Sequence, residues 1–282
     1  MPRFEVKKLD LTGLENTTDE EKLDIKVLHL RNVLFGEEHP DTISAMNNLA
    51  ATYGSLGKFA AAEKLQIKVL NLRNRLLGEE HPDTIHAMNN LANAYGSLGK
   101  YADVEKLQIK VLDLRNRLLG EEHPTTISSM SSLANTYGSL GKHTDAEKLE
   151  IKVLDLRNKL LGEEHLDTIT AMNNLAATYG SLEKYTDAEK LQIKVLNLRN
   201  RLLGEEHLDT ITAMENLVKI YYHLKKVKDA EQLEIQVVDT RTRIFGEGHL
   251  DTIKAVVLLA AIRSQVNTSG TEPRKTGESY AL

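Results

Sequence analysis

The stretch Leu77-Gly78-Glu79-Glu80-His81-Pro82-Asp83-Thr84 decides how this chain is organised, because close copies of it recur throughout the sequence. Its Gly-Glu-Glu-His core begins at Gly36, Gly78, Gly120, Gly162 and Gly204, and it returns as Gly-Glu-Gly-His at Gly246. Each step is 42 residues long, and Asp41–Pro82 is identical to Asp167–Leu208 at 36 of 42 positions. A fixed period of this length is the signature of a repeat protein.

Each copy predicts two helices. In the second copy, Met88, Leu91 and Tyr95 recur at i, i+3 and i+7, which indicates an amphipathic helix, helix A, over about 83–98. Helix A is expected to stop at a turn such as Gly99-Lys100-Tyr101, and helix B then runs to the Leu-Leu pair before the next Gly-Glu-Glu-His.

Local signals predict the ends of helix B. Thr18, Thr144 and Thr186 each open a capping-box pattern at its start. The glycine after its last turn, such as Gly78 or Gly204, is predicted to adopt the left-handed conformation.

No strand pattern competes, and a helix pair this short cannot bury its apolar stripe alone. Neighbouring pairs must therefore stack into an all-α solenoid of helix-turn-helix repeats. We expect a degenerate segment at 1–17, a repeat array at 18–266 and a disordered tail at 267–282. The five full repeats are placed at 41–77, 83–119, 125–161, 167–203 and 209–245, with a half repeat at each end.

Composition narrows the class of protein. The 282 residues contain no Cys and no Trp, which excludes disulfides, thiolate metal sites and Cys nucleophiles. The chain carries 36 basic and 41 acidic residues with interleaved signs, which disfavours nucleic-acid binding. No apolar run reaches the roughly 20 residues of a membrane span, and the first residues lack a secretory signal. We therefore expect a cytoplasmic protein that binds neither nucleic acid nor membrane.

The repeat resembles a known family. Leu49-Ala50, Tyr53, Gly57-Lys58-Phe59 and Ala62 fall at the signature positions of tetratricopeptide repeats. The 42-residue period and the Asn-Asn-Leu-Ala motif resemble the longer variant found in kinesin light chains and in fungal NB-ARC-associated repeat arrays. The resemblance implies a right-handed superhelical solenoid whose concave wall is lined by helix A. The chain departs from the family pattern midway through helix B, where the family places an aromatic or apolar residue: it has Gln66, Gln108, Glu150, Gln192 and Glu234.

Three chemical-looking features have structural explanations. The recurring histidines, His39 to His249, are spaced too far apart in a stack to share one zinc ion, so a loop or capping role is expected. Gly54-Ser-Leu-Gly-Lys58 lacks the spacing and the preceding strand of a phosphate loop. Basic residues such as Lys68, Arg73 and Arg75 have acidic neighbours and are interpreted as a solvated face. No catalytic constellation stands above the repeat background, so we expect no enzyme activity and no cofactor.

One face of helix A suggests a binding function. It is neutral and rich in amides, which suit the backbone of an extended peptide. In peptide-binding members of the family the second Asn of Asn-Asn-Leu-Ala makes such contacts, and Ser132 interrupts this series in the third repeat. The competing interpretation is that the amides order neighbouring helices. The candidate groove residues are Asn47, Asn48, Asn89, Asn90, Asn93, Asn135, Asn173, Asn174 and Asn216.

Two functions follow as hypotheses. The first is a non-enzymatic scaffold that binds a protein or peptide partner in this groove. The alternative is the sensor or self-association arm of a larger NB-ARC-type signalling ATPase whose nucleotide domain lies outside this chain. This end is predicted to be covered by a second copy of the chain in an end-to-end dimer, by a partner protein, by repeats lost from a longer parent, or by the tail at 268–282 folded back over it. The reason is that no helix B follows the sixth helix A, which is apolar nearly all round. Its apolar residues are Val256, Val257, Leu258 and Leu259.

Overall fold

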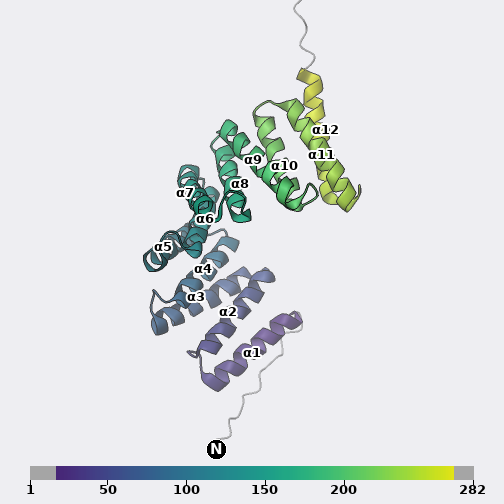
Figure 1. Ribbon diagram of the computed structural model, residues 1–282. Coiled ribbons are helices and arrows are strands. Elements are labelled where there is room, and N and C mark those ends of the chain that lie inside the picture. Colours follow the sequence, from purple (N-terminus) through teal and green to yellow (C-terminus); the bar gives the residue numbers. More distant parts are fainter. Residues whose placement is uncertain (1–16, 270–282) are drawn as a thin grey trace, which may run out of the picture. The chain divides into compact units, whose positions relative to one another are not determined.

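The computed structural model describes residues 17–269, and these form α-helices without any strand (Figure 1). The B helices are α1 (Asp19–Phe35), α3 (Phe59–Leu77), α5 (Tyr101–Leu119), α7 (His143–Leu161), α9 (Tyr185–Leu203) and α11 (Val227–Phe245). The A helices are α2 (Pro40–Ser55), α4 (Pro82–Ser97), α6 (Pro124–Ser139), α8 (Leu166–Ser181), α10 (Leu208–His223) and α12 (Leu250–Ser269). The helix pairs predicted from the repeat are confirmed.

The chain divides into two compact units. Unit 1 is Met1–Lys142 and contains α1 to α6, and unit 2 is His143–Leu282 and contains α7 to α12. Within each unit every helix packs against the next one along the chain, as expected for a solenoid of repeats. None of the described helices is long and apolar enough to cross a membrane.

The same core cluster recurs in the repeats. An Ile and a Met from helix A meet a Val and a Leu from helix B, as Ile43, Met46, Val69 and Leu72 do in the first repeat. The second and fourth repeats contain the same four residue types, and the fifth contains the first three of them. The cluster joins the two helices of a repeat, so its burial holds each pair together.

α12 is longer than the expected sixth helix A. It continues to Ser269, past the boundary placed at residue 266. The rest of the tail expected at 267–282 lies outside the described residues, as do residues 1–16 of the segment expected at 1–17.

The recurring histidine caps helix A. In each copy its Nδ1 accepts a hydrogen bond from the backbone N–H two residues later, as between His81 and Asp83 at 3.1 Å. The same bond is made at His39, His123, His165, His207 and His249, at 3.1–3.2 Å. The expected capping role is thus confirmed, because one of the unpaired donors of the first turn gains a partner.

Replacing this cap should weaken a single repeat. We expect His81→Ala to lower the free energy of unfolding by about 0.5–2 kcal/mol, because the first turn of α4 loses an acceptor. Chemical denaturation followed by circular dichroism measures the loss. His81→Asn supplies another capping acceptor and should retain most of the stability; equal losses in both variants would contradict the capping role.

The glycines that end helix B differ from the prediction. Gly78 and Gly204 have φ of 87° with ψ of 167° and 164°, so the left-handed helical conformation predicted for them is wrong. Their backbone is instead in a region that is almost exclusive to glycine. The glycine is needed because the chain extends away from helix B at once, which places the next helix A.

The turn after helix A does adopt the left-handed region. Gly57, Gly99 and Gly141 have φ of 71–72°, whereas Glu183 and Lys225 hold the same position at φ 58° and 61°. A residue with a Cβ pays about 1–2 kcal/mol there, partly offset by its smaller loss of backbone entropy.

This difference between copies predicts a stabilising substitution. Glu183→Gly should raise the free energy of unfolding by about 0.5–1 kcal/mol, because it removes the backbone strain. The reverse change, Gly99→Glu, is the matched control and should destabilise by a similar amount. Urea titrations of both variants check the prediction, and effects of the same sign would refute it.

The predicted capping boxes hold in one case of three. Thr18 is the N-cap of α1, and its Oγ1 accepts from the N–H of Glu21 at 3.2 Å. Thr144 and Thr186 lie inside α7 and α9, because these helices begin at His143 and Tyr185, directly after the turn. Lys184, the residue before α9, makes no side-chain cap.

Two polar links recur between a helix B and the next repeat. The first joins an Arg of helix B to a carbonyl in the first turn of the following helix A, as Arg73 Nη1 donates to the Asp83 carbonyl at 2.9 Å. The second joins a turn Lys to a Glu of the preceding helix B, as Lys100 Nζ donates to Glu63 at 2.6 Å. Arg73 is half-buried, so it is not the solvated residue expected from the sequence. Lys68 and Arg75 instead pair with Glu37 and Glu38.

Candidate functional site

The predicted groove residues fall into two groups by burial. Asn48, Asn93 and Asn135 are exposed on their A helices. The others are half-buried: Asn47, Asn89, Asn90, Asn173, Asn174 and Asn216. The exposed group is accessible to a ligand, whereas part of the half-buried group bonds within the protein.

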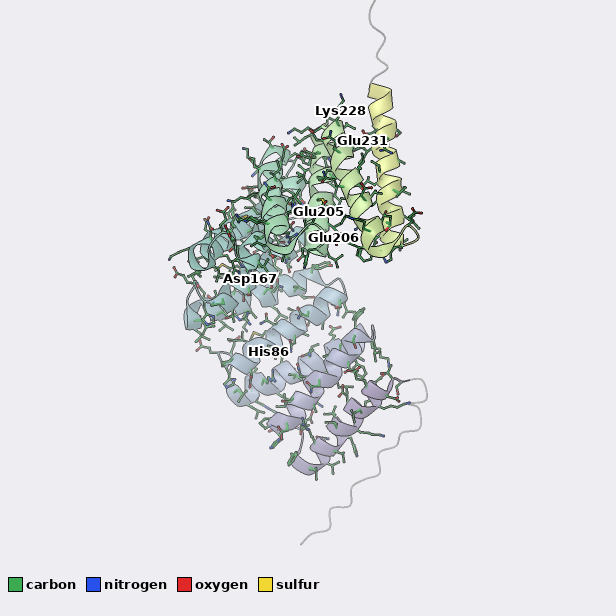
Figure 2. The ribbon with its side chains drawn as sticks, turned by 45° about the vertical axis from the view of Figure 1, so that its right-hand side comes forward. His86, Asp167, Glu205, Glu206, Lys228 and Glu231 are labelled. Carbon is green, nitrogen blue, oxygen red and sulfur yellow. The ribbon has the colours of Figure 1, made fainter. Side chains whose placement is uncertain are left out.

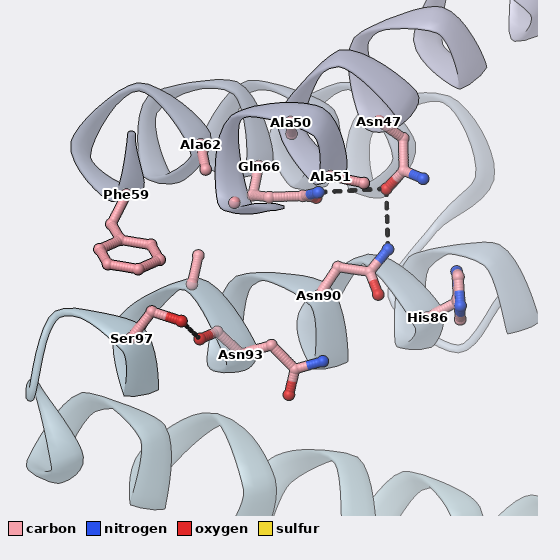
Figure 3. A pocket seen from close by; sticks show the side chains of 12 residues that line it. Asn47, Ala50, Ala51, Phe59, Ala62, Gln66, His86, Asn90, Asn93 and Ser97 are labelled. Atoms are coloured by element: carbon pink, nitrogen blue, oxygen red, sulfur yellow. Dashed lines mark hydrogen bonds between the residues drawn. The ribbon is translucent and has the colours of Figure 1, made fainter. Parts of the chain in front are cut away.

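In unit 1, an amide bridge joins three helices. Asn47 Oδ1 on α2 accepts from Gln66 Nε2 of α3 at 3.2 Å and from Asn90 Nδ2 of α4 at 2.7 Å (Figure 3). The bridge links the first Asn of one repeat to the second Asn of the next. These amides therefore order neighbouring helices, which was the competing interpretation of the Asn pattern.

The same bridge is present in unit 2. Asn173 Oδ1 on α8 accepts from Asn216 Nδ2 at 3.3 Å and from Gln192 Nε2 at 3.4 Å. Gln192 is 1% exposed, and its Nε2 also donates to the Ala213 carbonyl at 3.1 Å. A buried amide needs such partners to offset its desolvation.

The series is interrupted at the third repeat, as the sequence indicates. Ser132 holds the place of Asn90, and its Oγ donates to the Ser128 carbonyl of its own helix at 3.0 Å. Asn89, which would be its partner, donates from Nδ2 to the Ile85 carbonyl at 3.3 Å. The amide bridge between Asn47 and Asn90 therefore has no counterpart between Asn89 and Ser132.

In the fifth repeat, two carboxyl groups replace the amide bridge. Glu215 holds the position of Asn173 and Glu234 holds that of Gln192. Glu234 is 1% exposed, and Glu215 accepts from Arg241 at 2.6 Å. Burial, followed by the charge of Glu215, raises the pKa of Glu234 to about 7, and the charge of Arg241 opposes this shift. The fifth repeat thus contains a proton-binding group at the position where the first, second and fourth repeats contain the amide of Gln66, Gln108 and Gln192.

The middle position of helix B is the functional element that sequence reasoning missed. It was seen only as a departure from the family pattern, with no role assigned. The structure gives it one, because Gln66 and Gln192 are buried and bond to the first Asn of their repeats. The co-occurrence of Gln on helix B with Asn on helix A in the same copies was the available signal.

Two adjacent pockets open along this face of unit 1. The first has a volume of about 320 Å³ between α2, α3 and α4 (Figure 3). The second, of about 580 Å³, lies one repeat further on, between α4, α5 and α6. They share Asn93 and Ser97, so they form one continuous surface, which we call the asparagine face. The first is lined by Asn47, Ala50, Ala51, Gly54, Phe59, Ala62, Gln66, His86, Asn90, Asn93, Ala94 and Ser97.

The first pocket is lined mainly by apolar groups, whereas polar and apolar groups line the second in similar measure. Phe59 and Ala62 of α3 line the first pocket, and Tyr101 and Val104 of α5 line the second at equivalent positions. Amides and hydroxyls of α4 and α6 surround these apolar groups. Apolar pockets with a few converging polar groups are typical of ligand sites.

Helical glycines keep the pockets open. Gly54 lines the first pocket, and a Cβ added to it would meet no atom within 4 Å. Glycine within a helix costs about 0.5–1 kcal/mol relative to alanine, and no packing contact requires it here. The space left by the absent side chain is therefore a property of the pocket and not of the core.

A side chain at position 54 is expected to stabilise the helix and to reduce the volume of the first pocket. Gly54→Ala should raise the free energy of unfolding by about 0.5–1 kcal/mol, because it removes a helix-destabilising residue without a clash. Thermal and urea denaturation measure the gain. Gly78→Ala, at a positive-φ glycine, is the control and should destabilise; a loss at Gly54 would show that the glycine serves packing.

Within residues 17–269, no three His, Cys, Asp or Glu side chains gather in a way that could hold a metal ion. The chemistry available on the asparagine face is hydrogen bonding and apolar contact.

Comparison with known proteins agrees with the repeat geometry. A family model of the tetratricopeptide repeat matches residues 42–83, 84–125 and 126–167, and a second model of the same repeat matches residues 167–243. The chain belongs to the tetratricopeptide repeat family. Tetratricopeptide repeats are generally protein–protein interaction modules, and no catalytic family matches this chain. No curated protein matches the sequence.

Solved tetratricopeptide repeat structures share the fold. The nearly identical TPR-like repeats of a kinesin-light-chain-type protein from Podosopora anserina align with a TM-score of 0.67 and 25% identity, covering 73% of this chain and 97% of that one. BtubC from P. vanneervenii aligns with a TM-score of 0.62 and 18% identity, over 93% and 96%. A Pyrococcus horikoshii STAND protein with a tetratricopeptide repeat sensor aligns with a TM-score of 0.69 and 15% identity, over 87% of this chain and 36% of that one.

Proposed function

We propose that this protein is a non-enzymatic interaction scaffold that binds an extended peptide on the asparagine face. The observation that supports it is the pair of successive pockets in unit 1, each of which combines apolar side chains with an exposed Asn in its lining. An extended peptide presents both backbone groups and side chains, and this surface offers partners for both.

The amide bridge indicates that the Asn residues have two different roles, one in packing between repeats and one in ligand binding. Asn90 donates to Asn47, so its loss disturbs the junction between two repeats. Asn93 and Asn135 are exposed at the pocket rims, and their side-chain amides bind a ligand without breaking that junction. We therefore assign peptide recognition chiefly to Asn93 and Asn135, and order between repeats to Asn47 and Asn90.

A peptide selection on the full chain tests this assignment. Peptides from a random-sequence display library are selected on the protein, and the affinity of the best binder is measured by calorimetry. Asn93→Ala combined with Asn135→Ala should weaken binding by about 0.5–1.5 kcal/mol for each hydrogen bond lost, with little change in melting temperature. Asn90→Ala is the control and should lower the melting temperature. Unchanged affinity of the double variant would overturn the proposal.

The alternative is that the chain serves as the sensor or self-association arm of a larger NB-ARC-type ATPase. The fold shared with the sensor of a STAND protein favours it, at the level of fold alone. A full-length transcript that also encodes a phosphate-binding loop would support this alternative, and a transcript ending with this chain would oppose it.

For both functions we propose a cytoplasmic location. A chain of 282 residues without Cys needs no oxidising compartment for its stability. Fluorescent tagging of the chain in cells checks the location.

A further inference from the structure

The two terminal helices each carry one half of the recurring core cluster. α12 supplies the helix A half, Ile253 and Val256, which lie 42 residues after Ile211 and Met214. α1 supplies the helix B half, Val27 and Leu30. In the complete clusters these positions are at most 8% exposed, whereas Ile253 is 46%, Val256 48% and Leu30 47% exposed.

Both helices are held in place by their other face. On α12, Ala255, Leu259 and Ile262 are buried, and Arg263 Nε donates to Glu231 of α11 at 2.8 Å (Figure 2). On α1, Lys58 Nζ donates to Glu21 at 2.7 Å. Each helix is thus folded onto its own unit and leaves exposed the face that, in the complete repeats, packs against the other helix of the pair.

We propose that this protein associates head to tail, with α12 of one copy packing against α1 of a second copy. The join would complete a helix-turn-helix repeat from two chains and continue the interface that already holds α2 to α3, α4 to α5, α8 to α9 and α10 to α11. The occupant of each open face is therefore the complementary half repeat of this chain.

The proposed contact between α12 and α1 also brings opposite charges together. Within the chain, a Lys of helix B pairs with the Glu of the loop before helix A of its own repeat, as Lys68 does with Glu37 and Lys194 with Glu163. At the join these positions are held by Lys26 of α1 and Glu247 before α12. Opposite charges therefore meet at the rim when the two apolar faces meet.

At the join, both positions that form the amide bridge in other repeats are held by residues without an amide. Val257 stands where the first Asn of the bridge stands in other repeats. Asp24 stands where Gln66 stands, and it accepts from Thr52 Oγ1 at 2.6 Å within its own unit. No amide partner is needed across the join, because neither helix presents one.

An interface between two different faces does not close on itself by symmetry. Each added copy leaves one α1 and one α12 face open, so the association continues as a chain of copies. This distinguishes the head-to-tail contact from a symmetric pairing of two α12 helices, which stops at a dimer.

Two variants that each block one end provide the test. Ile253→Glu with Val256→Glu blocks α12, and Leu23→Glu with Leu30→Glu blocks α1. All four side chains are exposed, so the substitutions spare the folded core, which circular dichroism and melting curves check. Sedimentation and light scattering of the full chain, from micromolar to millimolar concentration, measure its mass.

The wild-type mass should rise with concentration above the 31.6 kDa of one chain, without stopping at two copies. Each blocked variant should remain at one copy, and an equal mixture of the two should form a complex of two copies, joined through the one intact pair of ends. A third variant, Glu20→Ala, should tighten association, because other repeats bury Ala or Val there.

Three outcomes would overturn the proposal. A wild-type protein that stays at one copy throughout leaves no role for a second copy at these faces. A dimer that persists when α1 is blocked shows that α12 pairs with itself. Blocked variants that assemble as the wild type does, while remaining folded, place the contact elsewhere.

Discussion

Replacing Glu234 by Gln is expected to remove most of the pH dependence of stability that arises in the fifth repeat. The pKa of Glu234 is raised to about 7 from 4.5, so the folded state favours the neutral carboxyl. The stability that the neutral Glu234 carboxyl contributes is fully present below 4.5, the pKa in the unfolded chain. This stability is lost as the pH rises from there through about 7. At 1.36 kcal/mol per pKa unit, a change from 4.5 to about 7 corresponds to roughly 3 kcal/mol.

Urea titrations between pH 5 and pH 8 measure this effect. The wild type should lose stability across the window, and Glu234→Gln should be the more stable protein at pH 8. Burial also raises the pKa of Glu150, so Glu150→Gln is a useful comparison, with an effect of the same sign. A Glu234→Gln variant that loses as much stability as the wild type between the two pH values would contradict the prediction.

The opposite substitution, Gln192→Glu, is expected to install the same pH dependence in the fourth repeat. The amide of Gln192 donates to Asn173 Oδ1 and to the Ala213 carbonyl, and both partners are acceptors. An ionised carboxylate at this 1% exposed position has no proton to donate and faces two oxygens. Burying it should cost about 3 kcal/mol at pH 8, and much less at pH 5, where the carboxyl is protonated.

Gln192→Leu separates the charge from the lost hydrogen bonds. It should cost about 1 kcal/mol at both pH values, because it removes the amide without introducing a titrating group. If Gln192→Glu and Gln192→Leu have the same stability at pH 8, burial of the charge is not the cause of the loss.

The repeat and its helices could be predicted from sequence because they depend on local patterns. Ile43, Met46 and Leu49 set the stripe of helix A, and the structure places all three in the core. A loop or capping role for the recurring histidine was also predictable, because equivalent residues of stacked repeats lie too far apart to share one zinc ion.

What escaped prediction depends on distances between helices. The Asn pattern alone fits a ligand or a neighbouring helix equally well, and the 2.7 Å bond from Asn90 to Asn47 decides for the neighbour in that case. The conformation predicted for Gly78 was wrong because glycine with a positive φ can adopt either the left-handed helical region or an extended region. The two regions differ in ψ, which the sequence does not set. The role of Gln66 required knowing which helix it faces.

The two recurring polar links have a consequence for how the gene can change. The Arg-to-carbonyl link always spans 10 residues and the Lys-to-Glu link always spans 37, as at Arg73 with Asp83 and Lys100 with Glu63. A duplication or loss of one 42-residue segment by unequal recombination therefore restores every such pair with an equivalent partner. An insertion of another length between Arg73 and Asp83, by contrast, changes the length of chain that joins a donor to its acceptor. The structure is therefore compatible with a change in repeat number by whole 42-residue units, because the register of each junction is retained.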